Sequence, residues 1–382
     1  MGLTSEGFLT VVVAAVALFP LLTLLLWNRL PGPRPVRAGS RLGLILLAQV
    51  SAVLLAALWI NNSYQLYTSW SDLFGQDGGT GPIAAATPAA TGRPGVRSAS
   101  LPNAKLFRPL SGVADGYSAT ISGPRSHIVN SVLVWLPPQY FESAYEHAEF
   151  PVVQLLSGTP GTPATWLEGM QAPFALTRLM DSGRAHPFIL VSAAINVDPG
   201  HDPDCSNIPN GPKVATWLTA DVRDLVLTSF RASSNRDSWG LMGYSEGGLC
   251  ASKLVLQYPR LYSAAVSLSG DDHPDGDLLK PGTAAYQQNA PLWLLQHKAP
   301  ADVSLLLTGT HQDGDVAAEA GAMAAAAHEP TTVQTLMAAR GGHNIGVWKA
   351  DETPAFEWLS ARLRAPTSLV YAAGPQLISG IG

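Results

Sequence analysis

The sequence contains little charge. Only 13% of its 382 residues are Asp, Glu, Lys or Arg, whereas soluble domains usually have about 25%. Part of the chain is therefore expected to lie outside aqueous solvent. The formal net charge is −5, which lacks the basic excess of a nucleic-acid-binding protein. No nucleic-acid partner is expected.

The first residues, "MGLTSEG", include no Lys or Arg. A cleaved signal peptide would need a basic lead-in, so the apolar stretch that follows is predicted to remain as a membrane helix over Phe8–Trp27. A second apolar stretch covers Leu42–Ile60. Each is long enough to cross about 30 Å of hydrocarbon as a helix. Residues 1–70 are thus predicted to form a membrane anchor with two transmembrane helices.

Basic residues are also missing from most of the first hundred positions. Arg29, Arg34, Arg37 and Arg41 gather between the two apolar stretches, and the next basic residue is Arg93. Short loops rich in Lys and Arg stay in the cytoplasm. Both ends of the anchor would then face outward, which predicts a multi-pass protein of the cell membrane whose main domain is extracytoplasmic.

Cysteine is scarce, since Cys205 and Cys250 are the only two in the chain. An extracytoplasmic compartment allows them to form a disulfide, and the alternative is two separate buried thiols. The nine histidines are scattered, without the spacing of a zinc or iron site. No phosphate-binding P-loop occurs either, so neither a metal nor a cofactor is expected.

Composition divides the rest of the chain. Residues 71–105 are rich in Gly, Ala, Pro and Thr and read as a linker. Residues 106–366 have the composition of one globular domain, and residues 367–382 form a tail.

Within the domain, an opening antiparallel pair is expected at 116–122 and 131–137. Further apolar runs of strand length follow: "FPVVQLL", "PFILVSAAI", "SWGLMG", "YSAAVSLSG", "VSLLLTG" and "TVQTLMA".

Helical patterns alternate with these runs. They cover Phe174–Ser182, Val214–Arg231, Glu246–Tyr258 and Val316–His328, and Thr353–Leu363 begins with Thr-Pro as a helix start would. Strands that alternate with helices predict a mostly parallel sheet with crossover helices, and continuous apolar strands indicate that both faces are covered. The expected class is α/β.

One short motif carries chemistry. Ser245 stands in Gly243-Tyr244-Ser245-Glu246-Gly247, between an apolar strand and a helical pattern. This strand–turn–helix context is that of a nucleophile elbow, which lifts a serine hydroxyl above the sheet. An ordinary turn is the alternative. A serine nucleophile needs a base, and His343 lies in a glycine-rich loop after the last strand.

The acid of a triad should follow a strand between the serine and the histidine. Asp313 is the preferred candidate and Asp315 the second, whereas Asp271 and Asp272 are more typical of solvated loop acids. Donors for the oxyanion are expected from the backbone N–H groups of Glu246, directly after the nucleophile, and of Thr159. The side chain of Glu246 is expected to be a solvated acid at a helix start.

The stretches "VLVWLPPQY", "PVVQLLSGTPGTPATW", "GYSEGGLCASKLVLQYPRLYSAAVSLSG" and "GGHNIGVW" resemble the "Putative esterase" family of α/β-hydrolases, which includes esterase D-like enzymes and the antigen 85 mycolyltransferases. The resemblance covers about residues 116–363 and implies an α/β-hydrolase fold. It places the family's nucleophile on Ser245, its histidine on His343 and its acid on Asp313. The oxyanion amides fall on Glu246 and Thr159.

The sequence therefore predicts a membrane-anchored, extracytoplasmic serine esterase or acyltransferase with an acyl-enzyme intermediate. Its expected partner is an ester, such as an acyl lipid or an acyl sugar, and the choice between hydrolysis and transfer stays open. The alternative is a non-catalytic cell-envelope protein that binds its ligand on a hydrolase scaffold.

Overall fold

The computed structural model describes residues 5–64, 70–73, 106–198 and 200–368. The predicted linker and C-terminal tail therefore lie outside the described residues, apart from 71–73 and 367–368. The described residues fall into two compact units. One lies within residues 87–309, 316–337 and 351–382, and the other within 1–86, 310–315 and 338–350.

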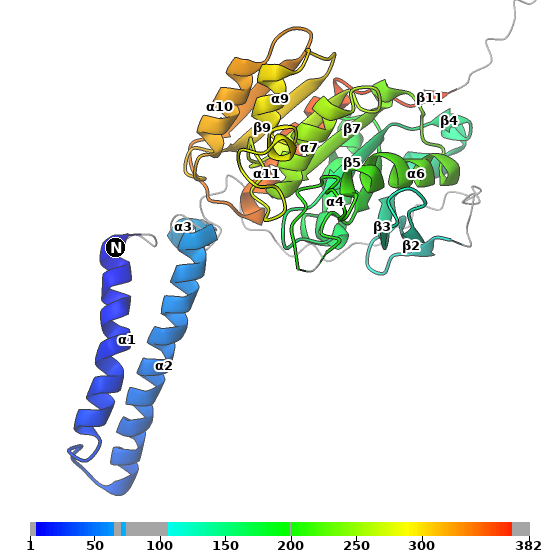
Figure 1. Ribbon diagram of the computed structural model, residues 1–382. Helices are drawn as coiled ribbons and strands as arrows, with labels where there is room; N and C mark the ends of the chain where they lie inside the picture. The colour runs from blue at the N-terminus through cyan, green and yellow to red at the C-terminus, as the bar shows by residue number, and fades with distance from the viewer. Residues whose placement is uncertain (1–4, 65–69, 74–105, 199, 369–382) are drawn as a thin grey trace, which may run out of the picture. The chain divides into compact units, whose positions relative to one another are not determined.

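Two long apolar helices form a hairpin near the N-terminus (Figure 1). They are α1 (Glu6–Leu26) and α2 (Arg34–Tyr64). Both are long and apolar enough to cross a membrane. Arg41 closes the hairpin, because its Nε donates to the carbonyl oxygen of Trp27 at 3.0 Å. Most of their large apolar side chains point away from the hairpin, as with Leu24, which is 78% exposed. Such a surface suits lipid better than water.

The main unit is built on a nine-stranded sheet in the order β1-β2-β3-β6-β5-β7-β8-β9-β10. Strands β2 and β3 are antiparallel, as is β3 to β6, and the run from β6 through β5, β7 and β8 to β9 is parallel. The expected parallel sheet with an antiparallel opening is thus confirmed. The strands are β1 (Arg108–Pro109), β2 (Gly116–Ser122), β3 (Val129–Trp135), β5 (Val152–Leu156), β6 (Ile189–Ala193), β7 (Trp239–Tyr244), β8 (Ala264–Leu268), β9 (Ser304–Thr310) and β10 (Thr332–Ala338).

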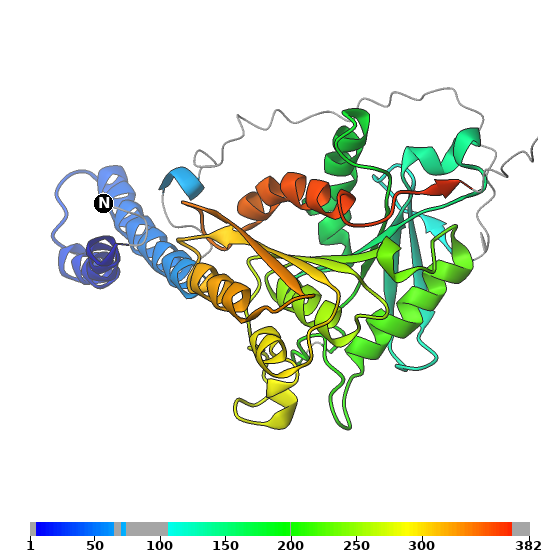
Figure 2. The same ribbon diagram turned by 90° about the horizontal axis from the view of Figure 1, so that it is seen from above.

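Helices cover both faces of this sheet. Figure 2 shows α4 and α11 on one face and α6 and α7 on the other. The helices of the domain are α4 (Ala172–Asp181), α5 (Val214–Thr216), α6 (Arg223–Ser229), α7 (Glu246–Gln257), α8 (Ala284–Gln287), α9 (Pro291–His297), α10 (Val316–Ala326) and α11 (Ile345–Ser360). A π-helical turn over Trp217–Val222 joins α5 to α6. A minor two-stranded sheet pairs β4 (Ala148–Glu149) with β11 (Thr367–Ser368).

The central strands lie in the core. Every residue of β5, β6, β7 and β8 is buried, which explains why they read as continuous apolar runs. The expectation was wrong for β10, where most residues are exposed. This strand ends the sheet and has a neighbour on one side only, so its apolar residues are not covered on both faces.

The start of the last helix was also mispredicted. Helix α11 begins at Ile345, not Thr353, and Pro354 lies inside it. Asn344 explains the earlier start, because its Oδ1 accepts hydrogen bonds from the N–H groups of Gly346 at 2.9 Å and Val347 at 3.2 Å. This is the capping interaction that typically opens a helix, and it outweighs the Thr-Pro signal further along.

Candidate active site

Ser245 occupies a sharp turn between β7 and α7. Its backbone has φ 56° and ψ −129°, a region that L-residues other than glycine rarely adopt and that costs about 1–3 kcal/mol. The turn is held on both sides. The Ser245 N–H donates to the carbonyl oxygen of Leu268 at 2.9 Å, and its carbonyl oxygen accepts from the N–H of Gly248 at 2.7 Å. The expected strand–turn–helix geometry is present.

The two flanking glycines are required by close backbone contacts. A Cβ atom on Gly243 would overlap the carbonyl oxygen of Gly247, and one on Gly247 would overlap that of Leu156 in β5. A Cβ on Gly158, after β5, would lie 2.8 Å from the Cβ of Ser245. The G-x-S-x-G spacing thus reflects three backbones that meet at the carboxyl ends of neighbouring strands, and the loop before Thr159 packs against Ser245.

Asp313 and His343 form a pair in the second unit. His343 Nδ1 lies 3.0 Å from Asp313 Oδ1 and 3.2 Å from Oδ2. Asp313 is only 3% exposed, whereas Asp315, the second candidate, is exposed. The two loops are joined where the Thr310 hydroxyl donates to the Gly341 carbonyl at 2.6 Å. A proton on Nδ1 would be held by the carboxylate, leaving the lone pair on Nε2.

The aromatic ring of Trp348 also contacts this imidazole. The ring centroids of His343 and Trp348 lie 5.0 Å apart, with planes at 86°. Aromatic pairs favour this edge-to-face arrangement. Asp272, one of the alternative acids, is engaged elsewhere, since its Oδ1 lies 2.6 Å from His273 Nδ1. Burial and the charge of Asp272 raise the pKa of the nearby Glu319 to about 7.

The side chain of Glu246 departs from its expected place. It is 5% exposed, and its Oε2 accepts a short hydrogen bond from the Thr159 hydroxyl. Burial, and next the charge of Asp202, raise the pKa of Glu246 well above its ordinary value. The expectation of a solvated acid was wrong because a loop after β6 folds over the helix start.

That loop supplies polar residues that the sequence did not single out. Asn196, Asp202 and Asp204 come from it, and Lys253 faces it from α7. Burial is the main cause that raises the pKa of Asp204 and lowers the pKa of Lys253. The concentration of acids in "NVDPGHDPDCSN" was the available signal. Sequence could not show that they turn inward.

A disulfide fastens the same loop to α7. Cys205 and Cys250 are bonded, with their Cα atoms 5.7 Å apart. Both residues are fully buried. The open choice between a disulfide and two thiols is therefore resolved as the disulfide, and the loop is tied to the helix that begins at the proposed nucleophile.

A mostly parallel sheet with a serine at a strained strand-to-helix turn defines the α/β-hydrolase class. The sequence profile of the "Putative esterase" family matches residues 130–358. The chain belongs to this family, which confirms the resemblance inferred from its motifs. The solved neighbours described below are under 25% identical and show that the chain shares their fold.

One curated relative and two solved structures illustrate which proteins the chain is similar to. An uncharacterised protein of Corynebacterium glutamicum is 22% identical over 271 residues, which cover 66% of this chain and 61% of that relative. The chain thus matches less than two thirds of the relative's length. An S-formylglutathione hydrolase from Agrobacterium tumefaciens has a TM-score of 0.58 at 15% identity, covering 68% of this chain and 100% of the other. A fluorophosphonate-binding serine hydrolase of Staphylococcus aureus, FphF, has a TM-score of 0.52 at 18% identity, covering 64% and 98%.

Proposed function

We propose that the protein is a membrane-anchored serine esterase or acyltransferase. The observation that carries the proposal is the strained backbone of Ser245, at φ 56° between β7 and α7. Strain of this kind is retained where a surrounding structure holds a functional group in place. In the proposed reaction, the Ser245 hydroxyl attacks the carbonyl carbon of an ester and forms an acyl-enzyme.

His343 is proposed as the base. Its Nδ1 lies beside Asp313, which supports the tautomer whose Nε2 accepts the Ser245 proton and later returns it to the leaving alcohol. The carboxylate would stabilise the imidazolium formed in between. Water or a second alcohol would then attack the acyl-enzyme, with His343 again as base.

The oxyanion of each tetrahedral intermediate is proposed to bind the N–H groups of Glu246 and Thr159. Glu246 opens α7, and the first N–H groups of a helix have no acceptor within it. Thr159 follows Gly158, whose backbone packs against Ser245. Loss of one such donor typically costs about 2.7–4 kcal/mol of transition-state stabilisation.

The domain is proposed to face the outside of the cell, on an acyl-lipid or acyl-sugar ester. Arg29 lies between α1 and α2, and three further arginines lie at the start of α2. Together they support this orientation through the positive-inside rule. An epitope tag fused to the carboxyl end would report it. Antibody binding to intact spheroplasts is expected, and binding only after lysis would reverse the orientation.

A fluorophosphonate probe tests the nucleophile, since such probes phosphonylate activated serines. The full-length wild type in detergent should be labelled, and Ser245→Ala should not. Ser269→Ala is the matched control, because Ser269 also follows a strand and has a positive φ of 50°. It should be labelled like the wild type. A folded wild type that resists labelling would instead favour the non-catalytic binding protein.

A further inference from the structure

A cluster of carboxylates lies beside the first turn of α7. Asp202, Asp204 and Glu246 each place a carboxylate oxygen within 4.8 Å of the others. Asp204 is fully buried, and Glu246 is 5% exposed. Charges so close together in the protein interior repel strongly unless a cation or protons compensate them.

Two neutral oxygens join the cluster. The hydroxyl oxygen of Thr159 lies 2.7 Å from Asn196 Oδ1 and 3.2 Å from Asp202 Oδ2, besides its contact with Glu246. The amide of Asn196 is oriented, because its Nδ2 donates to the carbonyl oxygens of Gly158 at 3.3 Å and Gly161 at 3.2 Å. Its oxygen must therefore face Thr159. One hydroxyl proton cannot satisfy three oxygen acceptors.

The neighbouring ammonium does not supply the missing donors. Lys253 Nζ donates to the backbone carbonyl of Asp204, to Ser206 Oγ and to Asn289 Oδ1. These three acceptors use the three protons of an ammonium group. The lysine therefore offsets one of the three carboxylate charges without a hydrogen bond to any of them.

Glu246 Oε1 is the clearest sign that a ligand is needed. This atom is buried and has no hydrogen-bond partner among the described residues, although Oε2 of the same carboxylate is bonded. A buried carboxylate oxygen without a partner is costly. The Glu246 carboxylate is a member of the group with Asp202 and Asp204, so an ion bound there would be held by the carboxylate that carries this unpartnered oxygen.

We propose that these residues form a Ca²⁺ site. All five groups, Thr159, Asn196, Asp202, Asp204 and Glu246, offer oxygen, the ligand atom of hard cations. Carboxylate oxygens within 4.8 Å of one another fit a common centre at the 2.3–2.6 Å of Ca–O bonds. Two positive charges would balance the three carboxylates and one ammonium. Ca²⁺ is favoured over Mg²⁺, which keeps several waters and requires a near-ideal octahedron.

The proposed ion would join three segments at the carboxyl edge of the sheet. Thr159 follows β5, Asn196 and the two aspartates follow β6, and Glu246 opens α7. Two of these segments carry the proposed oxyanion N–H groups. An effect of Ca²⁺ on turnover rests on the proposed function, whereas Ca²⁺ binding does not.

Calorimetric titration of the full-length chain in detergent, after removal of metals with EDTA, tests the site. One Ca²⁺ per chain is expected to bind and to raise the melting temperature. Asp202→Asn and Glu246→Gln should each weaken binding at least about tenfold, because affinity follows the charge of the ligands. Thr159→Val, at an exposed position, should weaken it less and serves if the acid variants do not fold.

The matched control is Glu319→Gln, in the separate acidic group of Asp272, His273 and Glu319. It should bind Ca²⁺ like the wild type. At about 10 mM Ca²⁺, even a site as weak as those of extracellular modules would be filled. If the folded wild type binds no Ca²⁺ at that concentration, the proposal is overturned. A loss of binding confined to Glu319→Gln would overturn it as well. Fluorophosphonate labelling of the same samples distinguishes the proposed Ca²⁺ site from the proposed esterase activity. Ca²⁺ binding without labelling of the wild type would support the ion site and contradict the esterase.

Discussion

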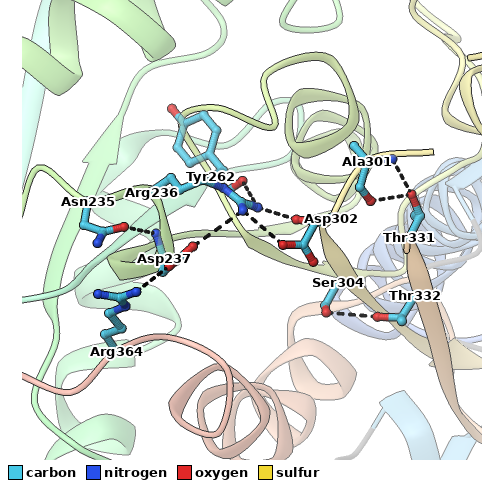
Figure 3. A network of polar contacts seen from close by, with 10 residues as sticks. All are labelled: Asn235, Arg236, Asp237, Tyr262, Ala301, Asp302, Ser304, Thr331, Thr332 and Arg364. Atoms are coloured by element: carbon cyan, nitrogen blue, oxygen red, sulfur yellow. Dashed lines mark hydrogen bonds and ion pairs between the residues drawn. The ribbon is translucent and has the colours of Figure 1, made fainter. Parts of the chain in front are cut away.

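The two ends of the central strands differ in how their charges are satisfied. At the amino end, Arg236 donates to the backbone carbonyl of Asp302 and lies 3.4 Å from its carboxylate. Arg364 binds Asp237 at 3.0 Å. Figure 3 shows these contacts in one network, where the acids Asp237 and Asp302 each have a basic partner, just before β7 and β9.

At the carboxyl end, the balance is reversed. Asp202, Asp204 and Glu246 share one neighbouring base, Lys253, whose donors go to other oxygens. The strained Ser245 lies at the same end, after β7. Ligands of parallel α/β sheets typically bind outside the carboxyl ends of the strands. The paired end thus holds the strands together, while the other end has the strained backbone and the unmatched charge on which the proposed chemistry and ion binding depend.

The first way to break this comparison is to remove the nucleophile. Ser245→Ala should lower turnover of a p-nitrophenyl ester on the order of 10⁶-fold, as in a working serine triad. Residues of a triad act as one unit, so adding His343→Ala to Ser245→Ala should cost almost nothing more. Steady-state kinetics of the single and double variants would measure this.

A loss below about tenfold in Ser245→Ala would remove the triad from the proposal, because the residual rate of triad variants comes from binding and the oxyanion hole alone. Fully additive losses would contradict the shared action of the two residues. Asp315→Asn is the matched control for the acid, since Asp315 is exposed while Asp313 faces His343. It should retain turnover, and Asp313→Asn should not.

Local sequence predicted the strand–turn–helix geometry around Ser245 well, because that geometry is local. The strand, the turn and the helix around Ser245 are contiguous, and the glycines at 243 and 247 are demanded by direct backbone contacts. The same holds for the parallel strands, whose full burial leaves an unbroken apolar run. Structural features that depend on neighbouring residues could therefore be predicted from the sequence.

Features that depend on distant segments could not. Glu246 is buried by a loop some 40 residues earlier in the chain, so its own neighbours suggested a solvated acid. Pairing of Cys205 with Cys250 needs a Cα separation that no pattern encodes. The start of α11 was missed for another reason: Asn344 is a local cap, but the Thr-Pro pair at 353 gave the stronger signal.

The disulfide offers the next largest effect. Cys205→Ala/Cys250→Ala opens a link across 45 residues of sequence, which should destabilise the domain by about 4 kcal/mol if the chain-entropy account holds. The melting temperature should fall, and wild type treated with reductant should melt like the variant. Unchanged melting would show that the acidic loop is held to α7 by its polar contacts alone.

The pH dependence of stability tests a half-buried acid, Asp351, beside the carboxyl half of β9. Burial raises the pKa of Asp351 to about 6, against the opposing hydrogen bond from Thr308 at 2.6 Å. The folded state then binds the proton more tightly than the unfolded state, so this group's contribution to stability falls as pH rises from about 4 to 6. Over that window the loss is about 3 kcal/mol.

Asp351→Asn keeps an acceptor for Thr308 and removes the charge. Its melting temperature should therefore exceed that of wild type at pH 8, and the difference should shrink toward pH 4. The difference between the two proteins isolates this carboxyl from the others that titrate on acidification. A variant less stable than wild type at pH 8 would show that the ionised carboxylate is better satisfied than its burial indicates.

The smallest effect is expected at the paired end. Asp302→Ala removes a carboxylate that is 84% exposed, while the backbone carbonyl of Asp302 still accepts from Arg236. Exposed ion pairs contribute at most about 1 kcal/mol, so the melting temperature should fall slightly, turnover should stay at the wild-type level, and 1 M salt should erase part of the difference. A loss of turnover in this variant would break the comparison itself, because it would mean that the amino ends of the strands also control the chemistry at their carboxyl ends.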